Sequence, residues 1–105
     1  MLDLNYLCKM AYENACKRAE YEPTIKLGAI NTLKHCAGEV VEATESCLYY
    51  YDNETSDYKA IFAGELADII CCVLTICGQE NIDIELALTK CMEKNFRRGK
   101  QDETC

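Results

Sequence analysis

The scarcity of helix-interrupting residues is the feature that most limits the fold of this chain. Its 105 residues include one proline, Pro23, and five glycines. Polar runs suited to turns occur only at 21–24, 52–57 and 78–83. A many-stranded sandwich or barrel needs a turn about every ten residues, so these interruptions are too few for one. Because no linker or repeat divides the sequence, we interpret residues 1–105 as a single domain.

The spacing of apolar residues between these interruptions is helical. Apolar side chains recur every three or four residues, which predicts helices over about 3–20, 25–51, 58–78 and 84–98. In the second helix they form a stripe that we expect to face a hydrophobic core: Ile30, Leu33, Ala37, Val40, Val41, Thr44 and Leu48. The pattern therefore predicts an all-α, four-helix, bundle-forming chain.

The third predicted helix is apolar nearly all round. Between Ile61 and Gly78 the only charged residues are Glu65 and Asp68. Such a helix is typical of the centre of a bundle, where we expect it to be buried on all sides, partly by another subunit. Two acids near its middle, with no basic anchor on either flank, argue against a membrane span. Long helices in so short a chain leave an incomplete core, which favours completion by a homo-oligomer, either a dimer or a tetramer.

Charge and cysteine content narrow the class of partner and the compartment. Eighteen acidic against 11 basic residues give a net charge of −7, which argues against binding to nucleic acid or an anionic membrane. A phosphate ligand remains compatible, because divalent cations bridge acids to phosphates. The first 22 residues are too charged for a signal peptide. The nine cysteines are odd in number and lack C-x-x-C spacing, so we expect small buried hydrophobes in a reducing cytoplasm.

Four carboxylates fall at matched positions on the second and third helices. Glu39 and Glu42 are three residues apart, as are Glu65 and Asp68, so each pair projects from one side of its helix. If the two helices fold back about the turn at 52–57, Glu42 lies opposite Glu65. Glu39 then lies opposite Asp68, one turn further along. The sequence therefore predicts a central antiparallel hairpin that carries four clustered carboxylates.

Such a cluster indicates a metal site. Four carboxylates repel one another at neutral pH unless something neutralises them. Ligands that are all oxygen favour Mg²⁺, with Mn²⁺ an alternative, over zinc. The apolar surroundings of Glu65 and Asp68 favour a site over a solvated surface, which is our interpretation of Glu45, Glu54 and Glu93.

Three segments, 35–43, 65–70 and 90–98, resemble the MazG-like, all-α nucleoside triphosphate pyrophosphatase superfamily. The shared pattern is Glu-x-x-Glu, a spacer of 22 residues (43–64), Glu-x-x-Asp and then a basic helix. The resemblance covers roughly residues 25–98. It implies a dimeric bundle or a dimer of dimers. It also implies a Mg²⁺-dependent hydrolase that cleaves a nucleoside or deoxynucleoside triphosphate between the α and β phosphates, releasing pyrophosphate.

The resemblance also implies roles for individual residues. Lys94 and Arg98 match an element that contacts phosphate, and Asn95 matches an asparagine found in many members. The residues implied to hold the metals and to be catalytic are Glu39, Glu42, Glu65 and Asp68.

Two positions leave alternatives open. His35 lies one turn before Glu39 on the same face, where it either lines the site or packs. Gly38 stands where many members of the superfamily have glutamate. That departure favours the alternative of a non-catalytic helical module that binds nucleotide or a partner protein and retains a vestigial metal site. The motifs fix neither the nucleotide nor the base pocket.

Overall fold

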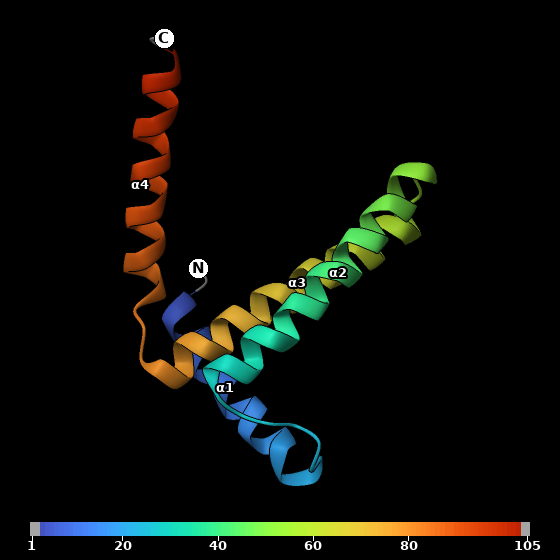
Figure 1. The fold of residues 1–105 in the computed structure, drawn as a ribbon, viewed down its shortest axis with the longest axis vertical. Coiled ribbons are helices and arrows are strands. Elements are labelled where there is room, and N and C mark those ends of the chain that lie inside the picture. Colours follow the sequence, from blue (N-terminus) through green and yellow to red (C-terminus); the bar gives the residue numbers. More distant parts are fainter. Residues whose placement is uncertain (1–2, 104–105) are drawn as a thin grey trace.

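The computed structural model describes residues 3–103, and their side chains as far as residue 99. Between residues 3 and 103 it contains four helices and no strand, which confirms the all-α prediction (Figure 1). The helices are α1 (Leu4–Tyr21), α2 (Ala29–Asp52), α3 (Ser56–Glu80) and α4 (Ile84–Glu103).

Two predicted helix boundaries were wrong, and glycine is involved in both. Helix α2 begins at Ala29 rather than at 25, because Gly28 has a φ of 119°, which only glycine adopts readily. The connection that contains Pro23 therefore continues to Gly28. Helix α4 continues past 98 to Glu103, since Gly99 weakens a helix without breaking it.

A polar clasp joins the start of α4 to the start of α1. Asp83 caps α4, because its Oδ1 accepts a hydrogen bond from the Leu86 amide at 3.1 Å. Asn5 donates from Nδ2 to the same carboxylate at 3.0 Å and accepts from the Ile84 amide at 3.1 Å. The hydrogen bond from Asn5, followed by that from Leu86, lowers the pKa of Asp83. The clasp therefore fixes where α4 leaves the molecule.

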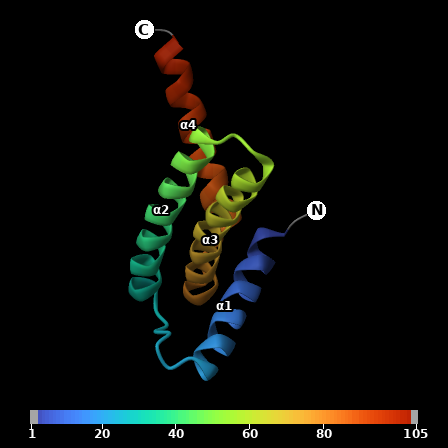
Figure 2. The ribbon, with the colours of Figure 1, turned by 90° about the vertical axis from the view of Figure 1, so that its right-hand side faces the viewer.

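Helix α3 is the central helix, as predicted. It forms an antiparallel hairpin with α2 and packs against α1 on its other side, so that Figure 2 shows it between the two. The approach of α1 is close at Gly78. A β-carbon built there would overlap the backbone carbonyl of Cys8, so only glycine fits this crossing.

Helix α4 diverges from the α2–α3 hairpin, which leaves an open V (Figure 1). The radius of gyration is 16.7 Å, whereas a compact chain of this length measures about 13 Å. The buried apolar residues between 3 and 99 are few and small: Cys8, Ala15, Ala43, Cys72 and Cys77. The folded single chain therefore has only the beginning of a core.

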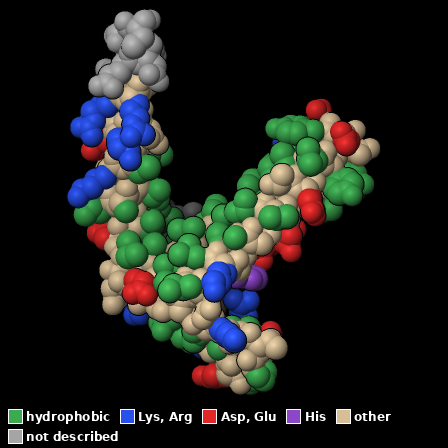
Figure 3. All heavy atoms as spheres, in the orientation of Figure 1, with side chains coloured by type: hydrophobic (Ala, Val, Ile, Leu, Met, Phe, Trp, Pro, Cys, Tyr) green, Lys and Arg blue, Asp and Glu red, His purple; other side chains and the backbone are tan. Residues whose placement is uncertain are grey.

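A single chain does not bury the third helix on all sides, because Ile61 and Ile70 are exposed on α3. Its further burial by another subunit stays a prediction. The α2 stripe is uncovered too, and Ile30 is 71% exposed. The reason is that α2 meets α3 through a different face, which carries Cys36 and Ala43, and not through its apolar stripe. Hydrophobic side chains accordingly cover the inner surface of the V in Figure 3.

By length and composition α3 is also apolar enough to cross a membrane, and little of its most apolar stretch is buried in the chain. A helix at the core of an oligomer has the same composition. Glu65 and Asp68 near its middle would be costly in hydrocarbon. The absence of a membrane partner therefore stays our prediction.

Candidate metal centre

The α2–α3 hairpin brings together three of the four predicted carboxylates. One carboxylate oxygen from each of Glu39, Glu42 and Glu65 lies within 4.8 Å of the others, and we call these three residues the acidic triad. Hard cations bind oxygens at about 2.0 to 2.6 Å, so oxygens about 4 to 5 Å apart can share one ion. The geometry therefore fits a divalent cation.

The fourth carboxylate, Asp68, stands at the rim of the triad. Its charge still reaches the triad, because it helps to raise the pKa of both Glu39 and Glu65. Its exposed side chain lines the pocket beside them. Glu65 and Cys72 are seven residues apart and share the line of α3 that faces α2, whereas Asp68 is displaced from that line. Asp68 therefore lines the pocket beside the triad and is not among the three grouped carboxylates.

Two oxygens of the triad are buried without a partner. Glu39 Oε2 and Glu65 Oε2 are shielded from solvent and accept no hydrogen bond from the described residues. An unpartnered buried carboxylate oxygen is costly, and more so when it carries charge. A bound cation would remove this cost. The unpartnered oxygens are therefore a second observation, besides the clustering of the carboxylates, that favours a cation site.

Burial and mutual repulsion act together on the triad. Partial burial raises the pKa of Glu39 and of Glu65, and the charge of Glu42 raises each of them further. Both effects make Glu39 and Glu65 keep their protons to a higher pH than an ordinary glutamate does. Without a cation the triad is thus a proton-binding site, and with one it is a ligand set.

His35 belongs to the edge of the site. Its Nε2 lies 2.9 Å from Glu39 Oε1, while the imidazole is 69% exposed and the Glu39 side chain only 14%. Of the two interpretations left open for His35, the contact favours a residue that lines the site and orients Glu39. The nearby positive charge of a protonated His35 lowers the pKa of Glu39, in opposition to the larger effect of burial.

A cavity of about 1100 Å³ adjoins the triad on the side of Glu39 and Asp68. Its walls are the second half of α1, the 22–28 connection, α2 and α3. Sequence reasoning missed the residues of α1 and of the connection, among them Arg18 and Lys26. The Lys17-Arg18 pair was a weak signal for them, but no spacing rule links α1 to the hairpin across a connection of this shape.

Lys94, Asn95 and Arg98 do not meet the triad within one chain. They are exposed on α4, whose main packing partner is α1. Figure 3 shows the basic side chains of α4 and the acidic side chains of the hairpin on different arms of the V. Their implied contact with phosphate stays a prediction.

Without a divalent cation, the protein is expected to lose stability as the pH rises from 4.5, the ordinary pKa of these carboxyls, toward neutral pH. Glu39 and Glu65 have pKa values raised above the ordinary 4.5, so the folded state holds protons that the unfolded state has released. Their contribution is present below that value and is lost as the pH passes the raised pKa. Melting temperatures measured across this range in a chelator would show the trend.

Mg²⁺ or Mn²⁺ should flatten this pH dependence, because the cation would take the place of the protons bound to Glu39 and Glu65. Glu65→Gln should flatten it too. Glu45→Gln, an exposed change on α2 outside the triad, should retain it. A trend equally steep in Glu65→Gln and the wild type would exclude the triad as its source.

Comparison of the chain with protein-family models, with curated proteins and with solved structures finds no match. The likeness to the MazG-like superfamily therefore stays a prediction from short motifs. What bears on function is the site itself, which combines a triad with two orphaned oxygens and an adjoining pocket of ligand size.

Proposed function

We propose that the chain is a Mg²⁺-dependent nucleotide pyrophosphohydrolase, which hydrolyses a nucleoside or deoxynucleoside triphosphate to the monophosphate and pyrophosphate. The observation that carries this proposal is the acidic triad with its two unpartnered buried oxygens. An all-oxygen set of ligands suits Mg²⁺ or Mn²⁺, the ions that accompany triphosphates in enzymes. The motif resemblance supplies the reaction class.

In this proposal the triad residues Glu39, Glu42 and Glu65 hold the metal. A bound Mg²⁺ supplies neutralisation of phosphate charge and a lowered pKa for a coordinated water. We assign to Asp68, which is exposed beside the triad, the role of accepting a proton from the attacking water. His35 keeps Glu39 oriented through the 2.9 Å contact. Phosphoryl transfer asks mainly for positioning and charge cancellation, and these residues provide both.

The proposed enzyme is a homo-oligomer, a dimer or a tetramer. Large apolar side chains are exposed along α2, α3 and α4, and a soluble monomer rarely leaves so continuous a surface open. A second copy would cover the inner face of the V. It would also supply what one chain lacks, because Lys94 and Arg98 reach a triad only when α4 meets the hairpin of another copy.

A second candidate function is a non-catalytic module that binds nucleotide or a partner protein. Gly38 favours it, since no described atom outside its own helical turn lies within 4 Å of the β-carbon position there. Nothing among these atoms replaces the acid that many members of the superfamily have at this position. The same site would then bind a metal–nucleotide complex without turnover.

One assay separates the two functions. The protein is incubated with Mg²⁺ and a panel of canonical, deoxy and modified triphosphates, and pyrophosphate is measured. The enzyme is expected to release pyrophosphate from at least one of them, and a chelator should abolish the release. Metal-dependent binding without release across the panel would favour the module, and neither binding nor release would refute both.

A further inference from the structure

The pocket beside the triad contains basic residues that the proposed mechanism does not use. Its walls carry Lys17, Arg18 and Lys26 from α1 and the 22–28 connection, and Glu39 and Asp68 from the hairpin. Its volume of about 1100 Å³ is ample for a whole nucleotide, since ligand pockets span about 300 to 1000 Å³. One pocket thus combines basic and acidic walls.

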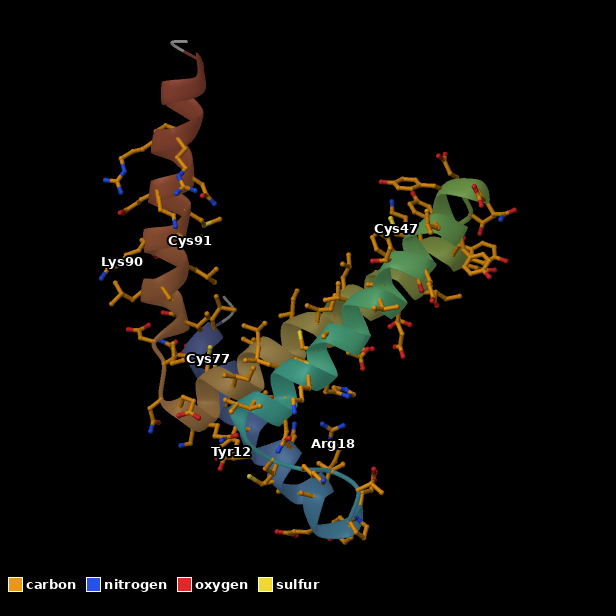
Figure 4. The ribbon with its side chains drawn as sticks, viewed as in Figure 1. Tyr12, Arg18, Cys47, Cys77, Lys90 and Cys91 are labelled. Atoms are coloured by element: carbon orange, nitrogen blue, oxygen red, sulfur yellow. The ribbon has the colours of Figure 1, made fainter. Side chains whose placement is uncertain are left out.

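Arg18 is the most informative of these residues. Figure 4 shows its side chain extending from α1 toward α2. The guanidinium forms no ion pair with any side chain between residues 3 and 99, although acids line the same pocket. A basic residue in the last turn of a helix is favoured by the helix dipole. The helix dipole explains why a basic residue is favoured at position 18. It does not explain why Arg18 lines the same pocket as Glu39 and Asp68.

A bare anion would be repelled from this pocket by Glu39 and Asp68. A phosphate chain that carries a divalent cation would be attracted instead. The cation would bind the carboxylates, and the remaining phosphate oxygens would accept hydrogen bonds from basic side chains. The arginine fork matches phosphate oxygens with two parallel hydrogen bonds. The two kinds of wall therefore suit one ligand that is both metal-bound and anionic.

We propose that Arg18 binds a phosphate group of the ligand, so that the phosphate chain runs from the acidic triad into the pocket beside α1. This inference rests on the proposed function and extends it, because it assigns the phosphate contact within one chain to α1 and not to α4. It also predicts that the phosphate chain binds well only when the cation is present.

The test is calorimetric titration of the protein with inorganic triphosphate, with and without Mg²⁺. Triphosphate carries the phosphate chain without a base, so the unknown nucleotide does not matter. The wild type should bind it only with Mg²⁺. Arg18→Ala should weaken the binding roughly tenfold or more, as expected for a lost charge-assisted hydrogen bond. The affinity of Arg18→Lys should lie between those of the wild type and Arg18→Ala, because lysine keeps the positive charge but cannot donate the two parallel hydrogen bonds of a guanidinium.

Lys9→Ala is the matched control, because it removes one positive charge from an exposed position on the same helix outside the pocket. It should bind triphosphate within about twofold of the wild type, and helical circular dichroism should be unchanged in all variants. Equal binding by Arg18→Ala and the wild type overturns this inference. So does a wild type that hydrolyses nucleotides but does not bind triphosphate. A wild type with neither nucleotide hydrolysis nor metal-dependent nucleotide binding overturns the proposed function itself.

Discussion

Glu65→Gln is expected to lower the rate of pyrophosphate release by about two orders of magnitude or more, because it removes charge from the ligand set. Glutamine has nearly the same shape, so the α2–α3 packing should be kept. Glu65 is a member of the triad, and one of its oxygens is buried without a partner. Asp68→Asn at the rim should also lose most of the turnover.

The same substitution should separate activity from stability. In a chelator, Glu65→Gln should melt at a higher temperature than the wild type, since one of three repelling carboxylates is gone. Mg²⁺ should then raise the melting temperature of the wild type more than that of the variant. Glu45→Gln should match the wild type in both assays. Near-normal turnover in both Glu65→Gln and Asp68→Asn would reject the assignment of the site.

The second large effect is expected at the exposed apolar stripe of α2. Val41→Asp places a carboxylate in the centre of the surface that a second copy would cover. Burial of an unpaired charge costs several kcal/mol, so the oligomer should dissociate at concentrations about a hundredfold higher than for the wild type. Light scattering across a dilution series measures this directly. Turnover should fall as the oligomer dissociates, because Lys94 and Arg98 would then no longer reach the triad of another copy.

Tyr21→Asp is the control for this experiment. Tyr21 is 82% exposed at the end of α1 and lies outside the stripe, so its replacement should leave the mass unchanged. A wild type that stays monomeric at all concentrations, or a Val41→Asp variant that stays oligomeric, would contradict the proposed assembly.

Much of the fold could be predicted from the sequence because its determinants are local. The helical spacing of apolar residues predicted the four helices. The hairpin register followed from equal distances to the turn at 52–57, which placed Glu42 beside Glu65. These predictions needed only neighbours in sequence or one reversal of the chain.

The predictions that failed depend on contacts between distant segments. The start of α2 is set by the backbone of Gly28, which no apolar pattern reveals. The direction of α4 follows from the Asn5–Asp83 clasp, whose partners are 78 residues apart. The pocket forms only where α1 and the 22–28 connection pack beside the hairpin. Its basic residues therefore could not be predicted from the acidic motifs of α2 and α3.

Gly78 sets the position of that basic wall, although it carries no functional group. Helix α1 approaches α3 closely only because this residue has no side chain, and Arg18 reaches the pocket from the far end of the same helix. A methyl group at position 78 would push α1 away from α3. The distance between the Arg18 guanidinium and the acidic residues of the pocket would then increase. Ligand affinity would then depend on Gly78, a residue without a side chain that contacts no ligand itself.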